Sequence, residues 1–497
     1  MNLPSSITDF KPEREIKIVQ FGTGNFLRGF VDWIIQRMNK NTSFNASVIL
    51  VSNVPTSKTL ETLRSQDYRY HVNLRGCSAG KTVNDLEEID LIESGISPYE
   101  DFEGFMRVAE MPDLRFVISN TTEAGIVFDP LCRLSDSPAS SFPARLTKFL
   151  FRRFEAFNGD PSKRLIILPC ELIFHNGKRL REYVMQYIEL WSFDLGAHYQ
   201  SFKNWVNKNC CFCSTLVDRI VPGHQKDNIS EIKEKIDFDD KMIVQAEPYH
   251  LWVIECPDNM DLPTLEKEFP ATQACLNVVF TDNEAPYHER KVTLLNGPHT
   301  LLSPIAFLCG VKTVRDACLH PLLGEYIKYV QTEELLPTLN LPEEELKDYS
   351  ESVLERFNNP FVCHHVESIM LNAFSKYATR ILPALRLYHQ RMGVLPVGMV
   401  LGLAAIIMYY RGGRLADGTP VRPNDSAPVL SLLDDLWKSD DYHTVAEGVA
   451  GSSLLWNGDK PDSIPGLTDL LALYLESIEL YGMLTTLKEC LSRCGRR

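Results

Sequence analysis

Glu15-Ile-Lys-Ile-Val-Gln-Phe-Gly-Thr-Gly-Asn-Phe-Leu-Arg-Gly29 is the stretch that decides the fold of this chain. Its alternating and then apolar start, Glu15–Phe21, predicts a buried strand. Gly22 and Gly24 follow, and apolar residues from Phe26 to Met38 then recur at the spacing of an amphipathic helix. Two glycines between a strand and a helix let the backbone approach a pyrophosphate over the helix N-terminus. The alternative is a tight turn that binds no ligand.

The turn departs from the usual dinucleotide-binding pattern at two positions. Leu27 stands where a third glycine is expected, three residues after Gly24. The second predicted strand, Ser47–Ser52, runs into Asn53 and offers no carboxylate for an adenosine ribose, so these residues do not choose between NAD and NADP. Arg28 is expected in the first helical turn, within reach of a phosphate.

Further strands are predicted at Arg115–Ser119 and Leu165–Pro169. Strands that alternate with helical segments indicate a parallel, doubly wound sheet over roughly the first 200 residues. Small polar residues follow Ser119, at the end of a strand where such sheets bind ligands. The predicted cofactor contacts are Phe21, Gly22, Thr23, Gly24, Asn25, Phe26, Arg28, Asn53, Asn120, Thr121 and Glu123.

Beyond about residue 285 the helical period dominates. We therefore predict an α/β chain, with an N-terminal Rossmann-type doubly wound sheet followed by a mostly α-helical C-terminal domain. The expected domains are 1–284, with a core of about 15–220 and a mixed extension, and 285–497. The predicted helices of the second domain are Leu294–Leu308, Pro321–Leu336, Pro342–Arg356, Val366–Leu387, Val397–Tyr410 and Ile464–Ser492.

Composition limits the partners of the chain. Its 497 residues carry a net charge of −14, which disfavours binding to nucleic acid or to an anionic membrane surface. The 13 cysteines are irregularly spaced, and the first residues lack the pattern of a signal peptide, so we expect a cytoplasmic protein. The uncharged stretch from Met392 to Tyr410 contains Pro396, Gly398 and Gly402, which favours a buried core helix over a membrane span.

Lys291-Val-Thr-Leu-Leu-Asn296-Gly-Pro-His299 carries the clearest chemistry. At about 100° per residue, His299 would lie about 80° and Asn296 about 140° from Lys291 around a helix. Lys is suited to move a hydroxyl proton, Asn to hold an oxyanion and His to orient a substrate hydroxyl. Pro298 requires the helix to start near Leu294 or to bend there. The alternative is a solvated Lys beside a core helix whose His is satisfied locally.

Lys-x4-Asn-x2-His is the catalytic motif of the polyol-specific long-chain dehydrogenases, the mannitol dehydrogenase superfamily, which this chain resembles. The resemblance extends in order over most of the chain. The matching segments are Ile18–Trp33, Pro169–Ile173, Phe212–Ile220, Arg290–Thr300, Arg356–Pro360 and Thr379–Pro383.

The resemblance implies metal-independent hydride transfer between NAD(H) and a C-2 or C-3 carbonyl of an open-chain sugar acid. Within the superfamily the chain is most similar to members that reduce D-tagaturonate to D-altronate in hexuronate catabolism. Lys291 would be the general acid/base, Asn296 an oxyanion donor and His299 a substrate-orienting residue, and Asp218 and Lys376 match substrate-pocket positions. The alternatives are a fructuronate (mannonate) reductase, a hexitol dehydrogenase and a nucleotide-binding regulator without catalysis.

Two positions depart from the mannitol enzymes. The triplet Cys170-Glu171-Leu172 lacks the oxyanion Asn of their Cys-Asp/Glu-Asn, and Asn176 is the candidate substitute. Ser368 stands where they carry an Arg. The resemblance implies that the uronate-reducing members share the departure at Leu172, which favours a sugar-acid substrate over a neutral hexitol. A uronate carboxylate needs cationic contacts. The candidates for these contacts are Arg380, Lys376, His364 and His365, with Arg356 further away.

We predict no metal site and no nucleic-acid or membrane partner. The run Cys210-Cys211-Phe-Cys213 has no second Cys/His cluster at zinc-finger spacing, which favours buried structural cysteines. The expected assembly is a monomer or a small homo-oligomer.

Overall fold

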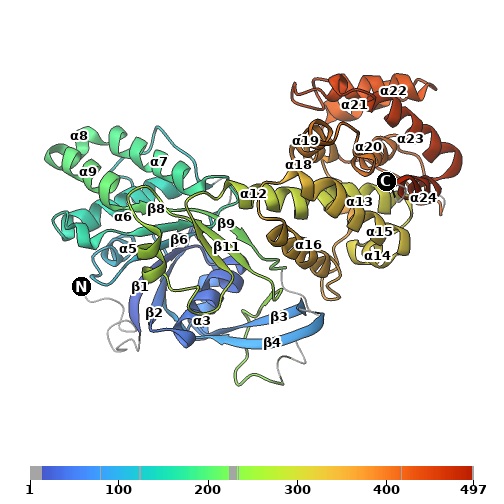
Figure 1. Cartoon of the computed structure of the whole chain (residues 1–497). Coiled ribbons are helices and arrows are strands. Elements are labelled where there is room, and N and C mark those ends of the chain that lie inside the picture. Colours follow the sequence, from blue (N-terminus) through green and yellow to red (C-terminus); the bar gives the residue numbers. More distant parts are fainter. Residues whose placement is uncertain are drawn as a thin grey trace. The chain divides into compact units, whose positions relative to one another are not determined.

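Strand β1 (Glu15–Phe21) forms where the alternation predicts it and lies inside a six-stranded sheet. The structure, a computed structural model, describes residues 14–494 except 79, 122–124, 223–231, 233 and 416. The chain divides into two compact units, Met1–Ala285 (unit 1) and Pro286–Arg497 (unit 2). In Figure 1 the colours run from blue at the start of unit 1 to red at the end of unit 2.

All neighbouring strands of the large sheet in unit 1 pair in parallel. The order is β5-β2-β1-β6-β7-β8. Counted within this sheet it reads 3-2-1-4-5-6, the order of dinucleotide-binding Rossmann sheets, so the predicted fold is confirmed. The order reverses between β1 and β6, which places the ligand-binding edge of such a sheet at the carboxyl ends of these two strands. The other strands are β2 (Ala46–Val51), β5 (Ile92–Ile96), β6 (Phe116–Ser119), β7 (Ile166–Pro169) and β8 (Cys211–Phe212).

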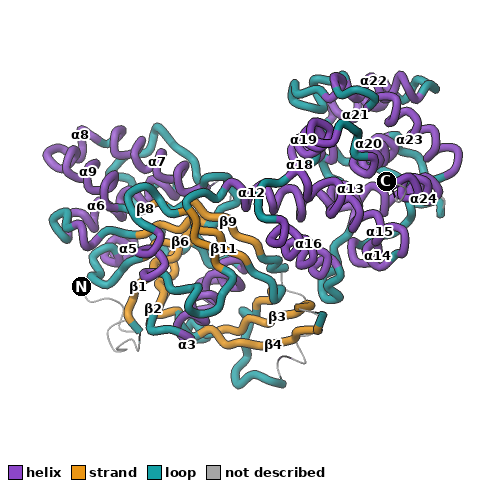
Figure 2. The backbone as a smooth tube through the Cα atoms, viewed as in Figure 1, coloured by secondary structure: helices purple, strands orange, loops and turns teal. Residues whose placement is uncertain are grey.

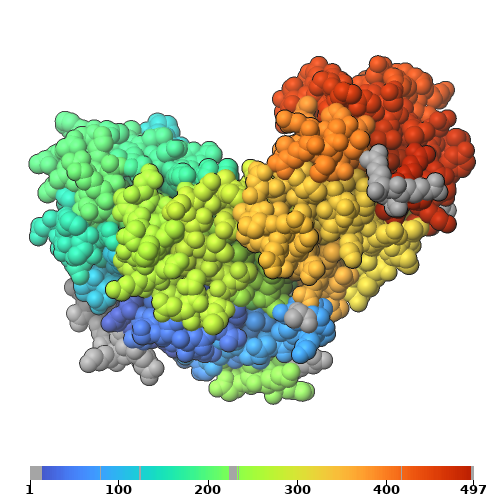
Figure 3. Space-filling view, viewed as in Figure 1, coloured from blue at the N-terminus to red at the C-terminus, as the bar shows by residue number. Residues whose placement is uncertain are grey.

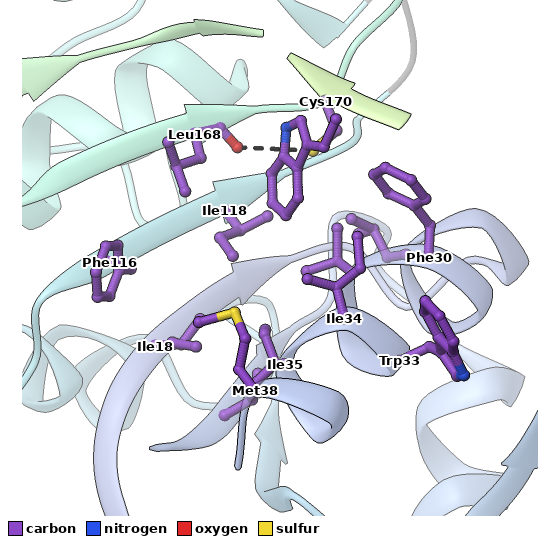
Figure 4. Packing of buried hydrophobic residues seen from close by; sticks show 14 of the residues in the cluster. Ile18, Phe30, Trp33, Ile34, Ile35, Met38, Phe116, Ile118, Leu168 and Cys170 are labelled. Carbon is purple, nitrogen blue, oxygen red and sulfur yellow. Dashed lines mark hydrogen bonds between the residues drawn. The ribbon is translucent and has the colours of Figure 1, made fainter. Parts of the chain in front are cut away.

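Both faces of the sheet are covered. Side chains of β1 pack into two separate cores, one on each face. Ile18 joins a core with the helix that follows β1, while Val19 and Phe21 join a core on the opposite face. In Figure 4 the sheet residues Ile18, Phe116 and Ile118 lie against Ile34, Ile35 and Met38 of that helix. The covering helices are α3 (Trp33–Asn41) on the first face and α5 (Phe102–Val108), α6 (Phe142–Ala156), α7 (Asn176–Leu190) and α9 (Tyr199–Asn209) on the second (Figure 1).

Two small sheets complete unit 1 and include the stretch after residue 200 that the sequence pattern left unassigned. One has the order β10-β3-β4 and the other the order β12-β11-β9. In the space-filling view the yellow-green segment, which includes β11, covers part of the visible face of unit 1 (Figure 3). The strands are β3 (Tyr70–Ser78), β4 (Lys81–Ile89), β9 (Ser214–Asp218), β10 (Val244–Ala246), β11 (Leu251–Glu255) and β12 (Val278–Thr281). The short helix α4 (Lys58–Ser65) precedes β3 in the chain, and α11 (Leu262–Glu268) lies between β11 and β12.

Helices make up the regular structure of unit 2 (Figure 2), as the periodicity predicts. The core helix α20 (Val397–Tyr410) is buried at almost every position, and no described helix is long and apolar enough to cross a membrane. The remaining helices are α14 (Val314–Leu319), α15 (Pro321–Tyr329), α16 (Glu343–Phe357), α17 (Val366–Ile369), α18 (Ala373–Arg380), α19 (Leu382–Met392), α21 (Ala427–Leu436), α22 (Tyr442–Ala450), α23 (Leu467–Tyr481) and α24 (Met483–Cys494), besides α12 and α13 described below.

Two of the predicted helices are wrong in length. The segment 366–387 breaks at Asn372, which has the left-handed φ of 54°, and again at Ile381 before Pro383. The segment 464–492 breaks at Gly482, whose φ is 81°. The hydrophobic period continues across these breaks because the separate helices pack on the same core, so periodicity alone does not reveal them.

Gly29 allows the helix after β1 to approach β10 closely. A Cβ at Gly29 would lie 2.8 Å from Val244 Cγ1 and 3.0 Å from Val221 Cγ1, whereas a Cβ at Gly24 would meet nothing within 4 Å. We expect Gly29→Ala to lower the stability of unit 1 by about 1–2 kcal/mol, because overpacking outweighs the helical preference of Ala. Thermal unfolding measures the effect, with Gly24→Ala as the matched control that changes stability much less. An unchanged melting temperature for Gly29→Ala would contradict the tight packing.

Candidate functional site

The turn after β1 is shaped by one glycine and left open at another. Gly22 has a φ of 128°, and a Cβ there would lie 2.8 Å from Leu27 Cδ1 and 3.2 Å from the Asn120 carbonyl oxygen. Leu27, at the position of the missing third glycine, therefore packs against this turn. Gly24 has an ordinary φ of −70° and open space where a Cβ would project. No described neighbour would clash with a side chain at position 24, so packing does not explain the glycine there. The close approach of a ligand to the backbone would explain it.

The carboxyl ends of β1, β2 and β6 come together at this turn. The Gly22 amide donates to Val51 O over 2.9 Å, and the Asn120 amide donates to Phe21 O over 3.1 Å. Asn53 Nδ2 lies 3.6 Å from the position of a Gly22 Cβ. The predicted contacts Gly22, Asn53 and Asn120 thus share the edge at which the strand order reverses. Glu123 lies outside the described residues.

The Glu171 side chain accepts hydrogen bonds from the carboxyl end of β6 and from the loop that follows it. Its carboxylate accepts the Thr121 amide at 2.8 Å, the Thr121 hydroxyl at 3.0 Å and the Ser119 hydroxyl at 3.1 Å. Burial raises the pKa of Glu171, and these three donors oppose that rise. The acidic residue of the Cys170-Glu171-Leu172 triplet therefore holds the loop after β6, a role that its residue type alone does not reveal.

Arg28 makes hydrogen bonds that hold the turn after β1. Its buried guanidinium donates to the carbonyl oxygens of Thr23 and Met242 and to Asn25 Oδ1, and it lies 5.3 Å from the centroid of the Tyr70 ring. These interactions fix the turn and direct the side chain inward, because each nitrogen of the guanidinium already donates within the protein. Three of its five N–H groups are thus engaged within the protein, and phosphate binding by Arg28 stays a prediction.

Asn176 departs from the prediction. Its buried Nδ2 donates to the carbonyl oxygens of Pro169, Glu171 and Thr215, and its Oδ1 accepts the Thr215 amide at 2.8 Å. An amide engaged in this way cannot act as the substitute oxyanion donor. Leu172 is 65% exposed and contributes no polar group.

The helix that carries Lys291 is continuous through the motif, but it is not a regular α-helix. Helix α12 (Ala285–Lys291) passes into a π-turn (Val292–Asn296) and then into α13 (Gly297–Leu308). The Gly297 amide donates to Val292 O, five residues earlier. The predicted start or bend near Leu294 is therefore a π-turn, a feature often found at functional sites. Because a π-turn closes over five residues, Lys291 and Asn296 lie one turn apart on the same side of the helix.

Gln331 compensates for Pro298. Proline has no amide hydrogen, so Pro298 cannot donate to Leu294 O, its ordinary partner in an α-helix. Gln331 Nε2 donates to Leu294 O over 2.9 Å from a fully buried position. The proline in the motif therefore makes a buried carbonyl available, and a side chain distant in the sequence satisfies it.

His299 lies in an aromatic and cationic environment of unit 2. Its ring centroid is 4.0 Å from that of Phe357, the last residue of α16, and 5.2 Å from that of His364. Burial lowers the pKa of His299 well below its usual range, and His364, Arg356 and Arg380 lower that pKa further. The imidazole is therefore neutral at pH 7 and able to share a hydrogen bond with a hydroxyl.

The cations predicted to bind a carboxylate do come together around His299. Arg380 Nη1 donates to the Thr300 hydroxyl over 3.2 Å, and Lys376 Nζ donates to Ile369 O over 2.6 Å. Burial lowers the pKa of Lys376, as does Arg380. Burial likewise lowers the pKa of His364, and His365 and Lys376 add to this effect. Neither Lys376 nor Arg380 forms an ion pair with a carboxylate of the described residues, so this cluster has an excess of positive charge.

Asp218 is the predicted substrate residue that belongs to unit 1. It ends β9, pairs in register with Leu251 and is buried. Its role in binding a substrate stays a prediction. The three cysteines at 210, 211 and 213 are also buried, and burial raises their thiol pKa values, to about 12 for Cys210. This agrees with structural cysteines.

Comparison with known proteins covers both units. Residues 16–267 match the family described as the mannitol dehydrogenase Rossmann domain, and residues 283–453 match the mannitol dehydrogenase C-terminal domain. The altronate oxidoreductase of Phocaeicola vulgatus is 54% identical over 482 residues, which cover 97% of this chain and 98% of that protein. The altronate oxidoreductase of Bacteroides thetaiotaomicron is 55% identical over 479 residues, 96% of this chain and 97% of that protein. Mannitol 2-dehydrogenase of Pseudomonas fluorescens, solved as a ternary complex with NAD and D-mannitol, has a similar fold, with a TM-score of 0.67, 22% identity and coverage of 97% and 95% of the two chains.

The bond from Gln331 to Leu294 O provides a test of the π-turn. Gln331→Met keeps the volume but leaves a buried carbonyl unsatisfied, which should lower the stability of unit 2 by about 1–3 kcal/mol. We expect a lower melting temperature and slower turnover, since Leu294 lies between Lys291 and His299. The control is Thr332→Val, which removes an exposed hydroxyl that donates to Lys328 O. Equal stability of Gln331→Met and Thr332→Val would contradict the compensation of Pro298.

Proposed function

The chain belongs to the mannitol dehydrogenase family and is an oxidoreductase, and we propose that it catalyses the reversible NAD-dependent reduction of D-tagaturonate to D-altronate. Its relatives at 54% and 55% identity are altronate oxidoreductases. The reaction needs a site for the dinucleotide, a group that exchanges a proton with the carbonyl oxygen, and cationic contacts for the substrate carboxylate. We assign the first need to unit 1 and the other two to unit 2.

The strand ends of unit 1 fit a dinucleotide. Gly24 leaves open space at the N-terminus of the helical run Asn25–Asn41, where backbone amides favour a phosphate. Asn53 and Asn120 offer polar groups beside the turn. Phe21, Thr23, Asn25, Phe26, Arg28 and Thr121 stay among the proposed contacts. NAD(H), when bound, supplies or accepts the hydride.

Lys291 is the proposed general acid and base. In the reductive direction its ammonium gives a proton to the carbonyl oxygen of the substrate, and in the oxidative direction its amine takes the hydroxyl proton. Asn296, one π-turn further along the helix, donates an amide hydrogen to the same oxygen and stabilises its negative charge. The neutral His299 ring orients a neighbouring hydroxyl. Because Leu172 provides no amide and Asn176 is engaged, Asn296 is the one amide that we assign to this oxygen.

The excess of cations around His299 is the observation that carries the choice of a sugar acid. Lys376 and Arg380 are partly withdrawn from water and lack a carboxylate partner among the described residues, which disfavours their charged forms. A substrate carboxylate offsets this cost through charge-assisted hydrogen bonds. A neutral hexitol does not, so the cluster favours a uronate over a polyol. Fructuronate has the same carboxylate, and it remains the second candidate substrate.

Replacing Lys291 tests the proton transfer. We expect Lys291→Met to lower kcat by about 10²–10⁴-fold, the usual contribution of a general acid or base. The dissociation constant of NADH, measured from its fluorescence, should stay within about twofold, since the cofactor contacts are assigned to unit 1. Lys312→Met, which removes an exposed lysine of the same unit, is the control. Near-normal turnover of Lys291→Met would refute the assignment, whereas loss of NADH binding would point to misfolding or to a cofactor role.

Arg380 tests the substrate class. With NADH, the wild-type protein should reduce tagaturonate faster than fructuronate and far faster than fructose, and NADPH should be the poorer reductant. Arg380→Met should raise KM for tagaturonate by about 10–100-fold, because a charge-assisted hydrogen bond contributes roughly 1.5–3 kcal/mol. KM for fructose should change little.

Arg411→Met is the matched control, because Arg411 is a unit 2 arginine that pairs with Glu479. Initial rates with each sugar and each cofactor measure these effects. If the wild-type protein reduced fructose faster than tagaturonate, the proposal of a sugar-acid substrate would be refuted. An equal rise in KM for fructose and tagaturonate would instead show that Arg380 does not recognise the carboxylate.

A further inference from the structure

Three side chains from distant parts of unit 1 converge at a site that the proposed reaction does not use. His175 precedes α7, Glu255 ends β11, and Glu284 lies seven residues before Lys291 in the chain. One possible ligand atom of each lies within 4.8 Å of those of the other two. His175 Nδ1 is 3.1 Å from Glu284 Oε1 and 4.0 Å from Glu255 Oε2. The residues are so far apart in sequence that their spacing does not reveal the group.

The two carboxylates are buried close together. The side chains of Glu255 and Glu284 are 7% and 2% exposed, whereas that of His175 is 34% exposed and leaves a path from solvent. Two carboxylates buried this close together are costly to keep charged unless a cation accompanies them.

The backbone holds the imidazole in place. His175 has the left-handed φ of 55°, which is uncommon for a residue other than glycine. Its amide donates to Glu284 Oε1 over 2.9 Å, and the Glu284 amide donates to Glu255 Oε2 over 3.0 Å. His175 Nδ1 is itself buried and makes no hydrogen bond within the described structure, although it faces the carboxylates. A ring nitrogen in this state is available as a ligand.

We propose that His175, Glu255 and Glu284 bind one divalent first-row transition-metal ion. Bonds of about 2.0–2.2 Å from such an ion place neighbouring ligand atoms roughly 3.0–3.5 Å apart, so the observed 3.1 and 4.0 Å need only a small closure. One imidazole nitrogen with two carboxylate oxygens suits manganese, iron or zinc better than calcium or magnesium, which prefer oxygen ligands alone. The ion would tie the start of α7 and the end of β11 to the segment that leads into α12. This role is structural and leaves the hydride transfer independent of metal.

Lys178 competes with the ion for Glu255. Its ammonium lies 2.7 Å from Glu255 Oε1, but the side chain is 58% exposed and free to swing into water. The ammonium compensates one of the two carboxylates, while a divalent ion compensates both. Removal of Lys178 should therefore strengthen metal binding, a result that a simple surface ion pair does not predict.

Mn²⁺ is the probe of choice, because it disfavours the thiols of this cysteine-rich chain. The untagged full-length protein is stripped with a chelator and titrated with Mn²⁺, and the signal of free Mn²⁺ is followed by electron paramagnetic resonance. We expect one ion per chain. Glu284→Gln and His175→Asn should each weaken binding at least about tenfold. Lys178→Met should tighten binding severalfold. Both ligand variants preserve the local backbone, since Gln keeps the acceptor for the His175 amide and Asn tolerates the left-handed φ.

His443→Asn is the matched control, because His443 faces a single carboxylate, Asp469, at 3.2 Å. It should bind Mn²⁺ like the wild type. Mn²⁺ should also raise the melting temperature of the wild type but not that of Glu284→Gln. Equal binding by the wild type and Glu284→Gln, or no binding by either, would overturn the proposal. These measurements do not depend on turnover, so they stand apart from the test of the oxidoreductase activity.

Discussion

Strand β1 has to bury side chains on both of its faces, and the arrangement of unit 1 depends on this constraint. Ile18 and Val19 point into opposite cores, so helices or small sheets must cover each side of the sheet. Parallel neighbours then place the ends of β1, β2 and β6 at one edge, and the order of the strands reverses beside β1. The tight turn at Gly22 and the open position at Gly24 lie at that edge. The sheet edge at which folds of this kind bind ligands is therefore a consequence of how β1 is buried.

In unit 2, the polar side chains of Lys291, Asn296 and His299 lie on a helical run that is largely buried. Pro298 removes one hydrogen bond from the helix that carries Lys291, and the π-turn changes the angular spacing of the residues along it. Gln331 satisfies the carbonyl of Leu294. Arg290, next to Lys291, pairs with Glu345 and lies 4.3 Å from the centroid of the Tyr349 ring, which fixes this helix to α16. The irregular segment is thus supported on both sides of the motif.

The sequence predicts what depends on local pattern and misses what depends on distant partners. Alternation in Glu15–Phe21 and the spacing of Lys291, Asn296 and His299 are local, and they predict the sheet, the helical second half and the motif. Arg28 illustrates the limit, because its interaction with Met242 joins residues more than two hundred positions apart. Asn176 is similar, since its bonds to Thr215 and Pro169 follow from the packing of α7. Pro298 does indicate that a carbonyl needs a donor, but nothing in its surroundings identifies Gln331.

Local charge, and not the net charge of −14, determines what each unit can bind. Charges in solution are screened over about 8 Å at physiological salt, whereas buried neighbours act on one another much more strongly. Unit 2 gathers Lys376, Arg380 and two histidines. Burial lowers the pKa values of Lys376 and His364, and the neighbouring basic groups lower them further. Unit 1 gathers Glu255 and Glu284, and the pKa of Glu284 rises. Burying like charges together costs free energy, and a ligand of opposite charge would offset that cost. The same reasoning therefore assigns an anion to the cations of unit 2 and a cation to the carboxylates of unit 1.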